Sequence, residues 1–175
     1  MDTSYDGREL VALARESLED HFLGRSRQLP DKGGMHGAFV TLEEDGALRG
    51  CIGYMQGVES LHRQVYTLAR EAAFSDWRFP PLGEDELAKI TVKVSVLSAM
   101  ETIGSLDDFV LGRDGILMTI CGRRAVFLPE VALETGWSKE EELAALSRKA
   151  GLPPDAWKSP DALFQTFTSE VFSEV

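Results

Sequence analysis

AFVTLEEDGALRGCIGY, residues 38–54, predicts two β-strands joined by a tight turn. The segments 38–43 and 47–54 are rich in apolar and β-branched residues, and the Asp45-Gly46 pair between them is a strong short-range signal for a β-hairpin. A slip of one residue in a hairpin sends every side chain to the other face. The loop length therefore decides where each side chain of this stretch points.

Two loop lengths are compatible with the pattern. A two-residue loop would place Arg49 and Cys51 on the same face as Val40 and Leu42, which puts an arginine among apolar groups. A three-residue loop over residues 44–46, with Gly46 in the left-handed conformation, separates polar from apolar side chains, and we favour it for that reason. It gives one face with Val40, Leu42, Leu48 and Ile52, and another with Phe39, Thr41, Arg49 and Cys51.

Arg49 and Cys51 form the first candidate site. A thiol is a nucleophile only as thiolate, and a nearby guanidinium favours the thiolate, so Cys51 is a candidate catalytic nucleophile and Arg49 its stabiliser. The alternative is structural, because a cysteine without a disulfide often behaves as a small buried apolar residue. Cys121 precedes Gly122 at a predicted turn, where we expect it to be exposed. The sequence leaves both roles of Cys51 open.

The loop FSDWRFPPL, residues 74–82, holds the second candidate site. In one hypothesis Arg78 binds the anionic group of a small substrate and Asp76 orients the guanidinium, since a planar guanidinium suits carboxylate and phosphate. In the other, Trp77 and Phe79 cap the core, and Asp76 pairs with Arg78 or caps a turn. Substrate binding and a purely structural role are both compatible with this composition.

The hexamer LRGCIG, residues 48–53, resembles the signature of the AMMECR domain family, whose bacterial members are called AmmeMemoRadiSam system protein A. Further motifs occur in the family's order: GAFVTL at 37–42, RFPPL at 78–82, GRDGI at 112–116, FLPEVA at 127–132 and KAGL at 149–152. Trp77 departs from the pattern, because the family more often has proline there. The resemblance implies one AMMECR-type domain over residues 1–175 and, in bacteria, an association with a Memo-type protein and a radical SAM protein. It also implies two closely packed α/β subdomains, with the hexamer near their junction.

The remaining pattern predicts helices between groups of strands. Apolar spacing indicates helices over residues 8–23 and 60–73, and strict alternation indicates a strand over 90–96. His62 falls on the second helix, where we expect a solvated surface histidine. Further elements are predicted in the second half of the chain: strands at 116–120, 125–128 and 163–172, a helix from Pro129, and a helix between a Ser138/Glu141 capping box and Gly151. This order favours an α+β fold with antiparallel or mixed β-sheets and flanking helices.

Composition and motifs exclude several classes of function. The 175 residues carry a net charge of -11, which argues against binding the phosphate backbone of nucleic acids. We find no run of about eighteen apolar residues and no signal peptide, so we expect a cytoplasmic protein that does not span a membrane. We expect no metal and no cofactor, because the sequence has no Cys/His cluster, no GxGxxG motif and no phosphate-binding loop.

Two functions remain open at this point. The first is an enzyme or enzyme component with a cleft around Cys51 and Arg49 that binds a small anionic substrate. The second is a non-catalytic adaptor in which the LRGCIG strand is structural and another surface docks a partner. Whether the chain is an enzyme at all is not decided by its sequence.

Overall fold

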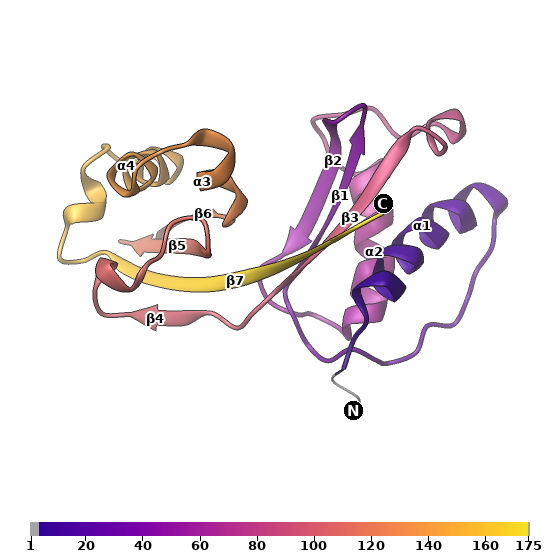
Figure 1. The fold of residues 1–175 in the computed structure, drawn as a ribbon, viewed down its shortest axis with the longest axis horizontal. Coiled ribbons are helices and arrows are strands. Elements are labelled where there is room, and N and C mark those ends of the chain that lie inside the picture. Colours follow the sequence, from indigo (N-terminus) through magenta and orange to yellow (C-terminus); the bar gives the residue numbers. More distant parts are fainter. Residues whose placement is uncertain (1–3, 175) are drawn as a thin grey trace. The chain divides into compact units, whose positions relative to one another are not determined.

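A computed structural model describes residues 4–174, which form two compact units (Figure 1). The described part of the first unit consists of residues 4–97 and 170–174, and the second unit is Ser98–Ser169. Strand β7 (Leu163–Ser173) contributes residues to both. Helices accompany a sheet whose register pairs are antiparallel, so the predicted α+β class is confirmed.

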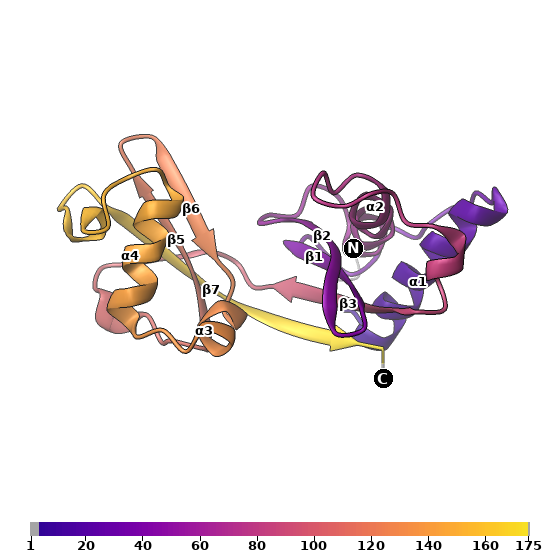
Figure 2. The same ribbon diagram turned by 90° about the horizontal axis from the view of Figure 1, so that it is seen from above.

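The first unit places two helices on a small antiparallel sheet (Figures 1 and 2). Helix α2 contacts β1 and β2, and helix α1 contacts β3. The hydrogen-bonded order of the strands is β2-β1-β3, followed by the last residues of β7. The bounds of five elements lie within a few residues of the prediction: α1 Gly7–Leu23, β1 Ala38–Glu44, β2 Ala47–Tyr54, α2 Leu61–Phe74 and β3 Ile90–Leu97. A short 3-10 turn, η1 Glu84–Glu86, precedes β3.

The core of this unit lies between the helices and one face of the sheet. Val40, Leu42, Val92 and Val94 alternate along β1 and β3, and all four are fully buried. They pack against apolar residues of both helices, among them Leu10, Leu18, Val65 and Leu68. On β2, a β-carbon at Gly50 would collide with the backbone carbonyl oxygen of Ala72 in α2. Only glycine at position 50 therefore allows α2 to approach the sheet this closely.

The hairpin differs from the three-residue loop that we favoured. Glu44 pairs with Ala47, so the loop is the two residues Asp45 and Gly46, with φ angles of 53° and 77°. These positive angles are those of a type I′ turn, which matches the twist of the flanking strands. A β-bulge then shifts the register between Leu42 and Glu43. The preference for the longer loop was wrong, because sequence alternation does not reveal a bulge.

The bulge nevertheless restores most of the predicted faces. Beyond it, Val40 pairs with Ile52 and Thr41 pairs with Cys51, so the apolar and polar sets lie on opposite faces as expected. Leu48 precedes the bulge and is 43% exposed, which contradicts its predicted place on the apolar face. Arg49 is the extra residue of the bulge, between the pairs Glu43/Leu48 and Leu42/Gly50.

The second unit has its own sheet and its own core. Strand β7 pairs with β4 and with β5, and β5 pairs with β6. Helix α4 lies beside β6 (Figure 2). Its Leu143 and Leu146 pack with Ile116, Met118 and Phe164. The elements are β4 Glu101–Ile103, η2 Leu106–Asp108, β5 Asp114–Ile120, β6 Arg123–Phe127, α3 Glu130–Thr135, α4 Lys139–Lys149 and η3 Ala156–Lys158.

Local signals in this unit act as predicted. Ser138 and Glu141 form a capping box at the start of α4, and Gly151 follows the helix with a φ of 78°. Cys121 and Gly122 form the β5-β6 turn, both with positive φ, and Cys121 is exposed. The capping box, the helix stop and the exposed turn cysteine are confirmed.

Candidate functional site

Cys51 belongs to a row of polar side chains that crosses three strands. It stands directly opposite Thr41 of β1, and Thr41 stands directly opposite Lys93 of β3. Residues paired in this way lie side by side on one face of a sheet. Because Val40, between Phe39 and Thr41, points into the helix-covered core, this row lies on the face opposite α1 and α2. We call Cys51, Thr41 and Lys93 the thiol row.

The contacts within the thiol row combine a thiol, a hydroxyl and an ammonium group. The sulfur of Cys51 lies 3.2 Å from Oγ1 of Thr41, and either atom can donate the hydrogen bond. The ammonium group of Lys93 donates to Glu43 at 2.9 Å, and its side chain is 33% exposed. Cys51 itself is half-buried. A partly accessible thiol thus lies two strands from a cation.

The backbone of Cys51 is held by the loop that follows α2. Its N–H donates to Oδ2 of Asp76 at 3.0 Å, and its carbonyl oxygen accepts from Arg78 at 3.5 Å. Arg78 also donates twice to the carboxylate of Asp76, from Nε at 3.0 Å and from Nη2 at 2.7 Å. Since β2 ends the strand order of this unit, the Asp76/Arg78 pair binds backbone groups on the outer edge of the strand.

These bonds decide what Asp76 can do. Hydrogen bonds from Arg78, and then from the backbone N–H groups of Cys51 and Arg78, hold the pKa of the buried Asp76 carboxyl well below its usual range, although burial opposes them. A carboxylate so strongly stabilised is a poor general base. Asp76 therefore holds Arg78 and the backbone of Cys51, as in the structural alternative that the sequence left open, and substrate binding by this pair stays a prediction.

Arg49 has a different environment from the one predicted. Its guanidinium donates to both oxygens of Glu86, at 2.9 and 3.0 Å, and to the carbonyl oxygen of Pro80 at 2.9 Å. Arg49 is 9% exposed, and the bidentate bond lowers the pKa of Glu86 to about 2. Its third nitrogen, Nη1, is buried without a hydrogen-bond partner in the described structure. The contacts of Arg49 anchor the loop 80–86 on β2.

Two further expectations for this region were wrong. Trp77 does not cap the core, since it is 90% exposed. Phe79 is partly buried, and the centre of its ring lies 5.9 Å from Cζ of Arg49 and 5.5 Å from Cζ of Arg78. His62 is not a solvated surface residue, because it is 2% exposed. Its Nδ1 lies 3.1 Å from the carbonyl oxygen of Lys32 and its Nε2 lies 3.4 Å from Glu9. Tertiary packing against the loop that follows α1 buries it.

Comparison with known proteins identifies the chain as part of a family. The model of the AMMECR1 family matches residues 11–172. The chain belongs to the AMMECR1 family. It is 40% identical to a protein of Methanothermobacter thermautotrophicus, over 97% of this chain and 94% of the relative, and 38% identical to protein TK0174 of Thermococcus kodakarensis, over 96% and 90%.

A solved structure of a similar protein has the same fold. The crystal structure of uncharacterized protein PH0010 from Pyrococcus horikoshii superposes with a TM-score of 0.86 at 35% sequence identity, over 96% of this chain and 91% of that chain. Family membership, predicted from the order of the motifs, is thereby confirmed.

Lys93 and Glu86 are the members of the site that sequence reasoning missed. The alternation in residues 90–96 places Lys93 on the polar face of its strand, but the partner strand lies about fifty residues earlier in the chain. Glu86 sits in a short 3-10 turn with no motif of its own. Within residues 4–174 we find no group of three or more His, Cys, Asp and Glu side chains suited to a metal ion. None of the helices in that range combines the length and hydrophobicity that crossing a bilayer requires.

Proposed function

We propose that this AMMECR1-type protein is an enzyme component that binds a small anionic substrate over the thiol row, with Cys51 as nucleophile or covalent carrier. The observation that carries the proposal is the alignment of Cys51, Thr41 and Lys93 across three adjacent strands. A hydroxyl bonded to the sulfur and a cation on the same face are features that favour a thiolate.

Two cations are available to an anionic substrate. Lys93 is partly exposed and bound to a single carboxylate, and Arg78 has a 42% exposed side chain beside the backbone of Cys51. A guanidinium binds carboxylate or phosphate through paired N–H groups, whereas an ammonium acts as a point charge. Arg49 is committed to Glu86 and Pro80, so we assign substrate binding to Lys93 and Arg78 and fold support to Arg49.

The covalent step that we propose is a substitution at carbon. The sulfur of Cys51 forms a bond to an electrophilic carbon of the substrate, the leaving group departs with its electron pair, and the thiol proton passes to water. Water is the proton acceptor in this scheme because Asp76 is strongly stabilised as a carboxylate and His62 is bound to Lys32 and Glu9.

Alkylation at neutral pH tests the site directly. Iodoacetate carries a charge that iodoacetamide lacks, and peptide mass spectrometry gives the rate of each reagent at Cys51. Lys93→Met should lower the iodoacetate-to-iodoacetamide rate ratio at Cys51 about fivefold, because it removes one favourable charge interaction of roughly 1 kcal/mol. The ratio at the exposed Cys121 should not change.

Lys89→Met is the matched control, since Lys89 is an exposed lysine of the same unit just before β3. It removes the same charge and should leave the ratio at Cys51 near that of the parent protein. The proposal fails if Cys51 reacts only after unfolding, or if Lys93→Met has no more effect than Lys89→Met.

An adaptor role is the second candidate, and the exposure of Trp77 favours it. A tryptophan with 90% of its surface exposed is unusual in a protein that acts alone, and tryptophan is enriched among the residues that dominate binding energy in interfaces. We propose the Memo-type and radical SAM proteins implied by the family resemblance as its partners. In this reading the LRGCIG strand only supports the fold.

Binding of each purified partner to variants separates the two functions. Trp77→Ala should weaken binding at least about tenfold if Trp77 is a central interface residue, whereas Leu133→Ala, at another exposed apolar position, should not. Cys51→Ala should leave binding intact while it lowers stability by about 1 to 3 kcal/mol. If Trp77→Ala binds the partners as tightly as the parent protein, the surface around Trp77 is not the docking site and the adaptor proposal fails.

A further inference from the structure

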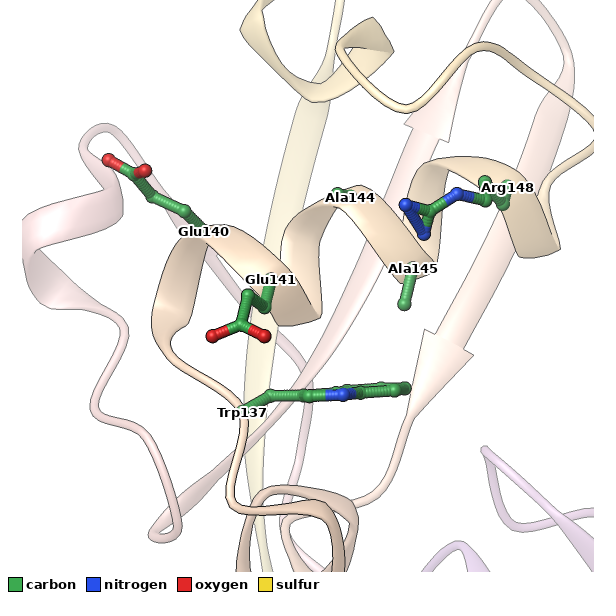
Figure 3. Close-up of a pocket in the computed structure, with 6 residues that line it drawn as sticks. All are labelled: Trp137, Glu140, Glu141, Ala144, Ala145 and Arg148. Carbon is green, nitrogen blue, oxygen red and sulfur yellow. The ribbon is translucent and has the colours of Figure 1, made fainter.

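The second unit contains a pocket that the thiol site does not explain. It has a volume of about 320 Å³ and lies between the side chain of Trp137 and helix α4 (Figure 3). Its lining comes from one short segment: Trp137, Glu140, Glu141, Ala144, Ala145 and Arg148. The volume is at the lower end of the range typical of small-molecule sites.

The indole of Trp137 forms one wall of this pocket. Figure 3 shows the ring edge-on beneath α4, with Ala145 pointing toward it. The backbone N–H of Trp137 donates to the Thr135 hydroxyl at 3.3 Å, and its ring lies 6.1 Å from that of Phe127. Because alanines occupy the facing turn of the helix, there is space over the indole for a planar ring.

The two ends of the pocket carry opposite charges. Glu141 and Arg148 are seven residues apart on α4, which corresponds to about 10 Å along the helix axis. Oε1 of Glu141 accepts the backbone N–H of Ser138 at 3.3 Å in the capping box, which leaves Oε2 and the second lone pair of Oε1 for a ligand. Within the part of the chain that the structure describes, the guanidinium of Arg148 has no hydrogen-bond or ion-pair partner.

We infer that this pocket binds a purine mononucleotide of the guanosine 5′-monophosphate type. Guanine presents two adjacent N–H donors, at N1 and N2, which suit the carboxylate of Glu141. Adenine presents an unprotonated acceptor at N1, which the same carboxylate repels. The base stacks on Trp137 and the phosphate pairs with Arg148.

The length of the pocket and the charge of the protein favour a mononucleotide over a nucleic-acid strand. A base edge and a 5′-phosphate lie at opposite ends of a mononucleotide, as do the carboxylate and the guanidinium of the pocket. The net charge of -11 opposes the approach of a polyanion but hinders a single phosphate far less.

Two-dimensional ¹H–¹⁵N NMR of the full chain tests the inference. The protein has three tryptophans, so three indole N–H signals are expected, and Trp137→Phe assigns the one in the pocket. Guanosine 5′-monophosphate should shift the Trp137 signal saturably and leave the signals of Trp77 and Trp157 in place. Adenosine 5′-monophosphate should bind about tenfold more weakly, as expected for one lost charge-assisted contact.

Variants at each end identify the contacts. Arg148→Met and Glu141→Gln should each weaken binding of guanosine 5′-monophosphate about tenfold. Glutamine also serves in a capping box, so Glu141→Gln leaves the start of α4 intact. Arg124→Met, which removes an exposed arginine elsewhere in the same unit, is the matched control and should leave affinity unchanged.

Three results would each overturn the inference. The first is equal affinity for the guanine and adenine nucleotides. The second is a saturable shift with ribose 5-phosphate, which would show simple anion binding at Arg148. The third is a titration in which the Trp137 signal does not move.

Discussion

Single residues of the LRGCIG hexamer have packing roles that do not require catalysis. Gly50 lies against the backbone of α2, and a β-carbon at Gly53 would collide with the ring of Phe39, which pairs with it across the hairpin. Arg49 anchors the loop at Glu86. Cys51 is the member of this set whose side chain bonds to Thr41 in the polar row, on the face away from the helices. The hexamer therefore combines a structural framework with the one thiol that we propose as the reactive group.

Gly50→Ala tests the framework role. The new methyl group would meet the carbonyl oxygen of Ala72, so α2 or β2 must shift, and we expect a loss of about 3 kcal/mol in the free energy of unfolding, measured in urea. Gly104→Ala is the matched control, because its methyl group would meet no atom within 4 Å. Similar stability in both variants would contradict the close approach of α2.

Asp76→Asn tests the ion pair that holds the backbone of Cys51. We expect it to lower the free energy of unfolding by about 1 to 2 kcal/mol at neutral pH, discounted for the partial exposure of Arg78. The folded-state pKa of Asp76 is depressed, so its contribution is complete above the unfolded pKa of about 4 and is lost as the pH falls further.

The stability difference between Asp76→Asn and the parent protein should therefore shrink in urea titrations below about pH 4. Asp85→Asn, at an exposed carboxylate of the same unit, should change stability little across the range. A difference that stays constant on acidification would show that Asp76 does not act through its charge.

Among the elements, the β1-β2 hairpin shows how two local features set one register. The two-residue type I′ turn alone would place Arg49 on the core face, and the bulge at Arg49 corrects this. Beyond the bulge, the faces match those of the three-residue loop that we had favoured. The separation of polar and apolar residues was a sound guide to the faces, although it gave the wrong loop.

Gly46→Ala tests the turn. Gly46 has a φ of 77° and a β-carbon there would meet no atom within 4 Å, so the cost comes from backbone strain alone. We expect a loss of about 1 to 2 kcal/mol in the free energy of unfolding. Asp45→Asn should be close to neutral, since asparagine tolerates the left-handed conformation. If Gly46→Ala leaves the free energy of unfolding unchanged, the backbone of the turn shifts to a conformation that alanine adopts without strain.

At the scale of the whole molecule, each unit has a separate apolar core. The first is built from α1, α2 and strands β1 and β3, and the second from α4, β5, β6 and β7. The two sets of buried residues share no member. A substitution that creates a cavity in one core is therefore expected to destabilise mainly the unit that contains it.

Leu146→Ala tests this separation. Leu146 is fully buried in the second unit, and its truncation should lower the opening free energy of amides in Ser98–Ser169 by about 2 to 5 kcal/mol. Hydrogen exchange read by mass spectrometry should show a smaller loss in the first unit. Leu68→Ala, in the first core, should give the reverse pattern. Equal losses in both units would show a single cooperative structure.

Signals from neighbouring residues predicted the helices and strands well. The site was harder to predict, because it depends on contacts between segments that lie far apart in the chain. The capping box of α4 and the turn at Cys121 depend on neighbouring residues, so they could be read directly. The burial of His62 and the exposure of Trp77 depend on segments distant in the chain, so both predictions were wrong. The link from Cys51 through Thr41 to Lys93 requires a β1-β3 pairing that encloses a whole helix.

The sequence by itself determined the family, the α+β class and most elements, because turn residues, caps and hydrophobic periodicity act over a few neighbours. The tertiary structure alone decided that Arg49 pairs with Glu86. It also brought the Asp76/Arg78 pair, which the sequence left as one alternative, against the backbone of Cys51, and it aligned Lys93 with Cys51. Charge pairing depends on distances between strands and loops, and only packing of the helices on the sheet sets those distances.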